Sequence, residues 1–400
     1  MPFAGATAAD APRGGRADLT EQLIWIGFSL TSAYAAILFA AWLQGLWLWD
    51  PQGRPLVVDF LNVYAAGAMV LDGHAAGAYD WSLHKQAEVA ALGRPFDGYL
   101  GWHYPPTFLF VAFPLALLPL IPATLVWTAL TLSAYAWTIR SIMGSRAAAL
   151  LALAFPAVVW NAYAGQNGFL TAALIGGSLA LLDRRPLAAG ALLGLLTYKP
   201  QFGLLFPLAL ACGGHWRAIA AAAATSIALA GASCAAFGAE SWHAFVAWMP
   251  AMTDAVFGQG RVGFNKLQTL LGLVRWSGGS MTLAWALQGI LMLACAGIVA
   301  WIWRRPARFD VKAAILSTLA LLATPYLFVY DLVALAVPMA FVLRMGLRDG
   351  FLPYELAGLS IAALLVLAFP ITGVPTGLLA VAIVAVVAWR RLDAADPRGI

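Results

Sequence analysis

Apolar residues dominate this chain in runs of about 17–25 residues, which short polar connectors separate. A helix of that length crosses the hydrocarbon core of a bilayer, about 30 Å thick. The runs must be helical, because lipid offers no hydrogen-bonding partner to a bare peptide group. The ten-residue alternation of a membrane β-barrel is not seen in the sequence. The pattern predicts an all-α, polytopic integral membrane protein.

The runs predict a bundle of about twelve transmembrane helices in a single domain, residues 23–392. The first span is expected from about Leu23 to Trp49. Between 107 and 140, a short run closed by prolines precedes a longer one, and we expect one net crossing there, with 108–120 re-entrant. Several other runs are short, so tilt or bilayer thinning is expected. The later spans lie at about 147–163, 168–182, 186–198, 202–213, 218–237, 281–303, 311–329, 331–343, 353–369 and 374–389.

The charges orient the bundle. Only 10% of residues are charged, 62% are hydrophobic, and the net charge is +5. The basic residues stand one or two at a time in alternate connectors, which the positive-inside rule places in the cytoplasm. This predicts a multi-pass protein of the plasma (inner) membrane with two cytoplasmic ends, a disordered tail at 1–22 and a short one at 393–400. No basic patch forms, so nucleic-acid binding is not predicted.

The first outer loop, residues 50–106, is the longest polar interruption near the start of the chain. Residues 60–72 and 81–92 within it are expected to be helices that lie at the membrane interface. Asp59 has two interpretations. It is a general base that accepts a proton from a sugar or lipid hydroxyl, or it is a loop charge that caps the following helix. Asn62 would share its helical face.

Lys199 ends an apolar run on the expected outer side, just before Pro200. It either snorkels to the interface or holds the phosphate of a lipid-linked sugar and stabilises the charge of the leaving group. Gln166 and Asn167 interrupt another apolar run. They either bond backbone between helices or recognise sugar hydroxyls.

Further polar residues fall on the same face. Tyr104 and His103 are pocket-lining candidates beside a rigid pair of prolines, and Tyr326 with Asp331 forms a later cluster. Asp331 is either functional, as membrane carboxylates tend to be, or an N-cap. Lys266 and Arg261 either bind phosphate or belong to an ordinary solvated loop. His84 and Glu88 are four residues apart, a spacing that suits a metal, but two ligands without a third favour structural pairing. No metal or cofactor is expected.

Taken together, the motifs resemble glycosyltransferase family 87, multi-spanning enzymes of the GT-C class related to polyprenol-phosphate-mannose-dependent mannosyltransferases. The residues that carry the resemblance cover about the first half of the chain, with Thr324-Pro325-Tyr326 in the second. They are Asp59-Phe60 with Tyr64, Gly73, Ala78-Tyr79-Asp80, Tyr104-Pro105-Pro106, Pro114-Leu115, Gly165-Gln166-Asn167, Arg184-Arg185-Pro186, Gly190, Gly194 and Lys199-Pro200.

The resemblance implies a GT-C-like bundle and an inverting transferase whose active site faces away from the cytoplasm. Its donor would be a hexose, such as mannose, on a polyprenyl phosphate, and its acceptor a glycan or glycolipid. The catalytic aspartate of the family maps onto Asp59. The family's later site often includes histidine, whereas this chain has Tyr326, Tyr330 and Asp331, which leaves the second functional group open. A flippase for lipid-linked sugars and a non-catalytic subunit of a polysaccharide assembly complex are the alternatives.

Overall fold

The computed structural model describes residues 13–98, 100–145 and 147–394, and these residues form helices joined by turns. Within these ranges there is no β-strand, only isolated bridges. The all-α prediction is therefore confirmed. The helices are α1 (Arg13–Leu43), α2 (Phe60–Leu71), α3 (Trp81–Leu92), α4 (Leu109–Leu115), α5 (Leu120–Met143), α6 (Ala148–Leu153), α7 (Ala157–Ala164), α8 (Gly168–Leu181), α9 (Pro186–Leu195), α10 (Phe206–Cys212), α11 (Trp216–Phe237), α12 (Ala239–Thr253), α13 (Leu270–Trp276), α14 (Met281–Trp303), α15 (Phe309–Ala323), α16 (Ala336–Asp349), α17 (Glu355–Thr372) and α18 (Gly377–Ala394).

Among the described residues, 5 helices are long and apolar enough to cross a membrane, so the chain is a membrane protein. They are residues 19–43 of α1, and α5, α11, α14 and α17. Other apolar helices are shorter: α8 has 14 residues, which at 1.5 Å per residue is about 21 Å. The count of about twelve crossings stays a prediction.

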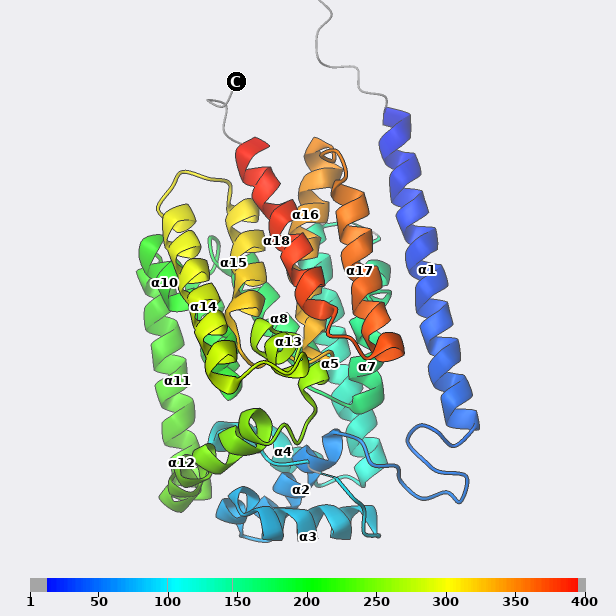
Figure 1. Ribbon diagram of the computed structural model, residues 1–400, viewed down its shortest axis with the longest axis vertical. Helices are drawn as coiled ribbons and strands as arrows, with labels where there is room; N and C mark the ends of the chain where they lie inside the picture. Colours follow the sequence, from blue (N-terminus) through cyan, green and yellow to red (C-terminus); the bar gives the residue numbers. More distant parts are fainter. Residues whose placement is uncertain (1–12, 99, 146, 395–400) are drawn as a thin grey trace, which may run out of the picture.

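The first helix begins earlier than the sequence pattern indicated. α1 starts at Arg13, so residues 13–22 are helical rather than part of a disordered tail, and it ends at Leu43 rather than near Trp49. Residues 1–12 and 395–400 of the two expected tails lie outside the described residues. α1 stands beside the bundle (Figure 1) and packs mainly on α6. Much of its apolar surface is exposed, as a lipid-facing helix requires.

Prolines divide the next apolar region as expected. α4 is only 7 residues long, about 10 Å, and cannot cross a bilayer by itself. α5 follows Pro119 and runs for 24 residues. The longer run is therefore the candidate span, and a re-entrant path for the short run stays a prediction.

Small residues bring the central helices close together. α9 packs on α11, and a Cβ added to Gly190 would lie 2.2 Å from the carbonyl oxygen of Ala218. Close approach at glycine and alanine is how membrane helices gain packing energy where lipid removes the hydrophobic driving force. α8 and α15 are nearly surrounded by other helices and form the centre of the core.

The helices of the first polar loop gather at one end of the bundle. Figure 1 shows α2, α3, α4 and α12 together at the end opposite the start of α1 and the end of α18. The two helices expected in this loop are present, at Phe60–Leu71 and Trp81–Leu92. The Asp80 carboxylate caps α3 by accepting from the amides of Ser82 and Leu83. This end of the molecule carries the candidate site.

Candidate functional site

A cavity of about 870 Å³ opens among the polar segments at this end. Its size is at the upper end of what small-molecule sites show, about 300–1,000 Å³. Segments distant in sequence contribute to it: the start of α2, residues 96–98 and 100–107, the turn after α7, the turn after α9, α11, α12 and residues 256–266 and 325–330. Of the side chains singled out from the sequence, those that line the cavity are Asp59, Asn62, His103, Tyr104, Gln166, Lys199, Arg261, Lys266 and Tyr326.

Asp59 precedes α2 in the N-cap position, but its side chain makes no capping hydrogen bond. Its Oδ2 instead accepts a hydrogen bond of 3.0 Å from Nε2 of Gln166, 107 residues away in sequence. Burial raises the pKa of the Asp59 carboxyl, while the Gln166 hydrogen bond and the charges of Lys266 and Lys199 oppose that rise. The capping interpretation therefore has no support, and the carboxylate is available to a ligand.

A tight turn holds Gln166 against the start of α2. Gly165 has a φ of +66° and ends α7, and a Cβ there would lie 2.8 Å from Cβ of Phe60. The side chain of Asn161 spans the turn: its Nδ2 donates to the carbonyl of Gln166 (3.0 Å), and its Oδ1 accepts from the amide of Gly168 (3.0 Å). The backbone that carries the Gln166 side chain is thus held in place.

Asn167 lies behind the cavity wall rather than in it. It is buried, and its Nδ2 donates to the hydroxyl oxygen of Tyr104 at 2.7 Å. The carbonyl of Tyr104 accepts from the hydroxyl of Tyr79 (3.0 Å), and its ring packs on Trp102 and Phe108. Burial raises the pKa of Tyr104, so its hydroxyl keeps its proton and can donate it into the cavity.

Lys199 lines the cavity with a fixed ammonium group. Its Nζ donates to Oδ1 of Asp331 at 2.7 Å, and both side chains are buried. Oδ2 of Asp331 accepts from the amide of Phe328 (3.3 Å). An ammonium has three donors, so the carboxylate orients Lys199 while leaving it able to contact a ligand. Asp331, expected as a ligand contact or a cap, lies behind Lys199.

Lys266 is an exposed cation of the cavity, as is Arg261. It makes no ion pair with any described carboxylate, and its charge acts on Asp59 ahead of that of Lys199. Arg261 is held by Gln259, to whose Oε1 its Nε donates at 2.7 Å. Lys266 and Arg261 both lie in the turns between the π-helical segment Asp254–Gly258, which follows α12, and the start of α13. These turns are partly exposed, as a solvated loop would be, and they also line the cavity.

Three further side chains complete the polar wall. The Oδ1 of Asn62 is buried and has no hydrogen-bond partner among the described residues. Burial lowers the pKa of His103 to about 4, so its imidazole is neutral near pH 7. The ring of Tyr326 packs against Phe328 and Phe257. These groups offer hydrogen bonds rather than charge to a ligand.

Sequence reasoning missed the apolar wall that α11 and α12 supply. Its lining residues include Ala230, Trp242, Phe245, Met249 and Met252. Phe245 is placed by its contact with Tyr79, at 5.6 Å between ring centroids. Nothing in the spacing of α12 distinguishes these residues from an ordinary membrane helix. The aromatic and methionine content of a stretch that follows a full-length span was the available signal.

The pair formed by His84 and Glu88 is buried under the site. Nε2 of His84 lies 3.5 Å from Oε1 of Glu88. Burial lowers the pKa of His84 to about 3 and raises that of Glu88 to about 8. The described residues contain no group of three or more His, Cys, Asp or Glu side chains that could hold a metal ion. A structural role for the pair stays a prediction.

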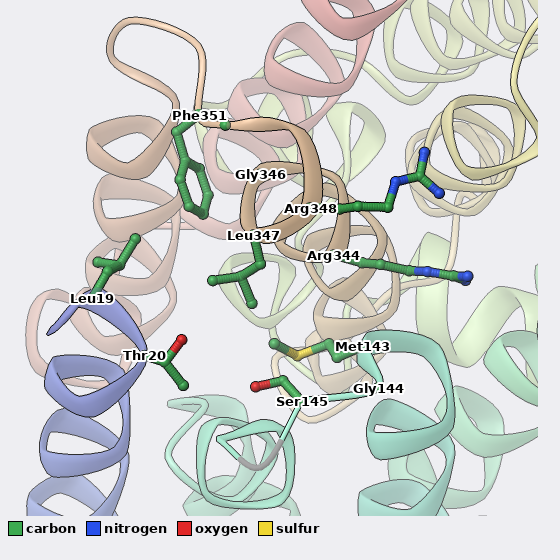
Figure 2. A pocket seen from close by; sticks show the side chains of 11 residues that line it. Leu19, Thr20, Met143, Gly144, Ser145, Arg344, Gly346, Leu347, Arg348 and Phe351 are labelled. Atoms are coloured by element: carbon green, nitrogen blue, oxygen red, sulfur yellow. The ribbon is translucent and has the colours of Figure 1, made fainter. Parts of the chain in front are cut away.

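A second cavity, of about 460 Å³, lies at the other end of the bundle, between α1, the end of α5 and the end of α16. Figure 2 shows Leu19 and Thr20 on one side and Ser145 below, with the side chains of Arg344 and Arg348 directed away from them. Both arginines pair with carboxylates, of Asp310 and Asp349. This cavity has no carboxylate or histidine among its described lining residues, so we place the candidate site in the larger one.

The comparison with known families agrees with this geometry. The sequence profile of glycosyltransferase family 87 matches residues 102–325, more than half of the 400-residue chain. The matched segment contains Gln166, Lys199 and Lys266, whereas Asp59 precedes it and Asp331 follows it. No curated protein and no solved structure matches the chain. This chain, an all-helical membrane bundle, therefore belongs to glycosyltransferase family 87.

Proposed function

We propose that this membrane glycosyltransferase moves a hexose from a polyprenyl-phosphate donor to a hydroxyl of a glycan or glycolipid, with inversion at the anomeric carbon. One observation carries the proposal: the Asp59 carboxylate, held by Gln166, shares a cavity with the ammonium groups of Lys199 and Lys266. A base and a phosphate-binding cation in one cavity are the two groups that this transfer requires.

Asp59 acts as the general base. The acceptor hydroxyl oxygen attacks the anomeric carbon of the donor, its proton passes to the Asp59 carboxylate, and the bond from that carbon to the phosphate oxygen breaks. The electron pair of that bond leaves with the polyprenyl phosphate. A base with a pKa raised towards neutral accepts a proton more readily than an ordinary aspartate, which suits this role.

The lysines stabilise the leaving group. The donor phosphate is a monoanion when esterified to sugar, and it gains negative charge as the sugar departs. Lys266, exposed in the cavity, contacts the phosphate directly, and Lys199 contributes from its fixed position beside Asp331. Fixed charges in a partly dehydrated site stabilise such a transition state strongly. Gln166, Asn62 and Tyr104 orient the sugar hydroxyls, and Asn167 positions Tyr104.

The apolar wall of the cavity suits a lipid-linked substrate. Trp242, Met249 and Met252 on α12 continue from the polar residues, and α11 beside them exposes apolar side chains. Methionine adapts its shape to an irregular apolar ligand. Burial of an isoprenoid chain along this wall contributes about 25 cal/mol for each Å² removed from water.

We place this end of the bundle at the outer face of the inner membrane, with both chain ends in the cytoplasm. The site lies at the end of the bundle opposite the start of α1 and the end of α18 (Figure 1). Basic residues at the end of α18, such as Arg390 and Arg391, favour the cytoplasm for that end. A reporter fused within the loop that holds Asp72 would read the external compartment if this orientation is correct, and the cytoplasm if it is inverted.

The two alternatives require different geometry. A flippase is expected to bind its cargo near the bilayer midplane between two halves of the bundle, whereas this cavity is built from the segments at one end. A non-catalytic subunit needs no contact between Asp59 and Gln166 and no cavity shared with Lys199. The geometry favours transfer over both.

The test is transfer by the purified protein. Radiolabelled polyprenyl-phosphate hexoses are incubated with the protein and a membrane lipid extract, and labelled product is separated from donor. We expect Asp59→Asn to lower the rate of product formation by about 10²–10⁴. Asp72→Asn, which changes an exposed carboxylate outside the cavity, should leave the rate unchanged. Equal rates for Asp59→Asn and the wild type would refute the proposal.

A further inference from the structure

The segment Phe96–Gly98 forms part of the cavity wall, and neither the family match nor the proposed transfer step uses it. It precedes the matched residues and joins α3 to the aromatic stretch around Trp102. Phe96, Asp97 and Gly98 all line the cavity. They place an aromatic ring, a carboxylate and a glycine backbone side by side there.

Asp97 is a carboxylate without a partner. It is exposed, and it makes no hydrogen bond or ion pair with any described residue, in contrast to the neighbouring Asp50 and Asp80. Asp97 and Asp59 line the same cavity. A carboxylate accepts up to four hydrogen bonds, and here all of them are available to a ligand.

The segment is held in place from behind, which separates it from an ordinary surface loop. Nζ of Lys85, on α3, donates to the carbonyl of Gly98 at 3.1 Å and lies 3.1 Å from the centroid of the Phe96 ring. Just before it, Arg94 donates to the Asp50 carboxylate at 3.1 Å and to the carbonyl of Pro55 at 3.0 Å. Binding groups on an anchored segment lose little entropy when a ligand arrives.

We propose that Phe96 and Asp97 form an acceptor subsite, which binds a second sugar ring of the glycan or glycolipid acceptor. The ring of Phe96 offers an apolar surface for the C–H face of the sugar. Asp97 accepts hydrogen bonds from two of its hydroxyl groups. The subsite rests on the proposed transfer, and it places a second sugar unit of the acceptor next to the one that Asp59 deprotonates.

Equilibrium binding tests the subsite independently of catalysis. Purified protein in detergent is titrated by calorimetry with octyl disaccharides that differ in their hexose units. We expect at least one to bind, and its dissociation constant to rise roughly tenfold or more in Asp97→Asn, because a hydrogen bond to a charged group is lost. Phe96→Ala should weaken binding as well, while Phe96→Tyr, which keeps the ring, and Asp72→Asn should not.

The outcomes separate the subsite from the transfer reaction. If no disaccharide binds, or if binding is unchanged in both Asp97→Asn and Phe96→Ala, the subsite is wrong. If binding depends on Asp97 but labelled donor yields no product, the subsite stands and the proposed transfer fails. Thermal unfolding of each variant in the same detergent excludes a folding defect, and Asp97→Asn, an isosteric change at an exposed position, should unfold with the wild type.

Discussion

Replacing Gln166 with leucine tests how the cavity tunes its base. Nε2 of Gln166 donates to the Asp59 carboxylate at 3.0 Å, and this hydrogen bond favours the charged form. A hydrogen bond to a charged group contributes about 1.5–3 kcal/mol, and one pKa unit corresponds to about 1.4 kcal/mol. Gln166→Leu removes an interaction that lowers the pKa of Asp59, so it should raise that pKa further. The turn itself should survive, because Asn161 holds Gln166 through its backbone carbonyl.

The assay is the pH dependence of kcat/KM for sugar transfer, whose acidic limb reports the base of the free enzyme. Asp59 must be ionised to accept a proton, so activity falls as pH drops through its pKa. A raised pKa moves this limb to higher pH in Gln166→Leu. Gln86→Leu, on the exposed face of α3, is the matched control and should leave the limb in place. A lower rate with an unshifted limb in Gln166→Leu would refute this role for the hydrogen bond.

Three further predictions concern the charges around the cavity. Lys266→Met should raise the KM for the polyprenyl-phosphate donor at least tenfold, and Lys266→Arg should raise it less, because arginine keeps the positive charge. An unchanged donor KM in Lys266→Met would show that this residue does not bind the phosphate. Asp331→Leu should lower the free energy of unfolding by about 3–5 kcal/mol, because it leaves Lys199 buried and unpaired. The double variant Lys199→Met/Asp331→Leu should recover most of that loss, as measured by denaturant unfolding in detergent. An Asp331→Leu variant as stable as the wild type would contradict the pairing. Glu88 has its pKa raised to about 8 in the folded protein, so its own contribution to stability should be full below its ordinary pKa and should be lost as pH rises through 8. The buried His84, with its pKa lowered to about 3, costs stability at acidic pH in both proteins, so the comparison is made between about pH 6.5 and 9. Thermal unfolding of the wild type should show a decline over this range that Glu88→Gln lacks, and parallel pH profiles would contradict the prediction.

Local signals in the sequence predicted local structure well. The boundaries of α3 follow from Asp80, which caps its start, and from Gly93, which ends it with a φ of +74°. The division of the next apolar region into a short α4 and a long α5 follows from Pro119 and Pro122. The start of α1 was missed, because residues 13–22 are too polar to count as a span although they continue its helix.

Contacts between distant segments could not be predicted from one sequence. Asp59, Gln166 and Lys199 were each candidates, but the hydrogen bond across 107 residues depends on how the helices pack. The 132 residues between Lys199 and Asp331 likewise hid an ion pair that changes the role of both side chains. Asp97 was passed over because an exposed carboxylate in a loop shows no pattern until the cavity beside it is known.

The central claim is that Asp59 removes the proton of the acceptor hydroxyl at this cavity. It is tested most directly by comparing wild type and Asp59→Asn in single-turnover transfer of labelled hexose from polyprenyl phosphate, at protein concentrations where both have bound the donor. The account predicts donor binding within a few-fold of the wild type and a transfer rate lower by about 10²–10⁴. Transfer at the wild-type rate, with donor bound, would contradict it.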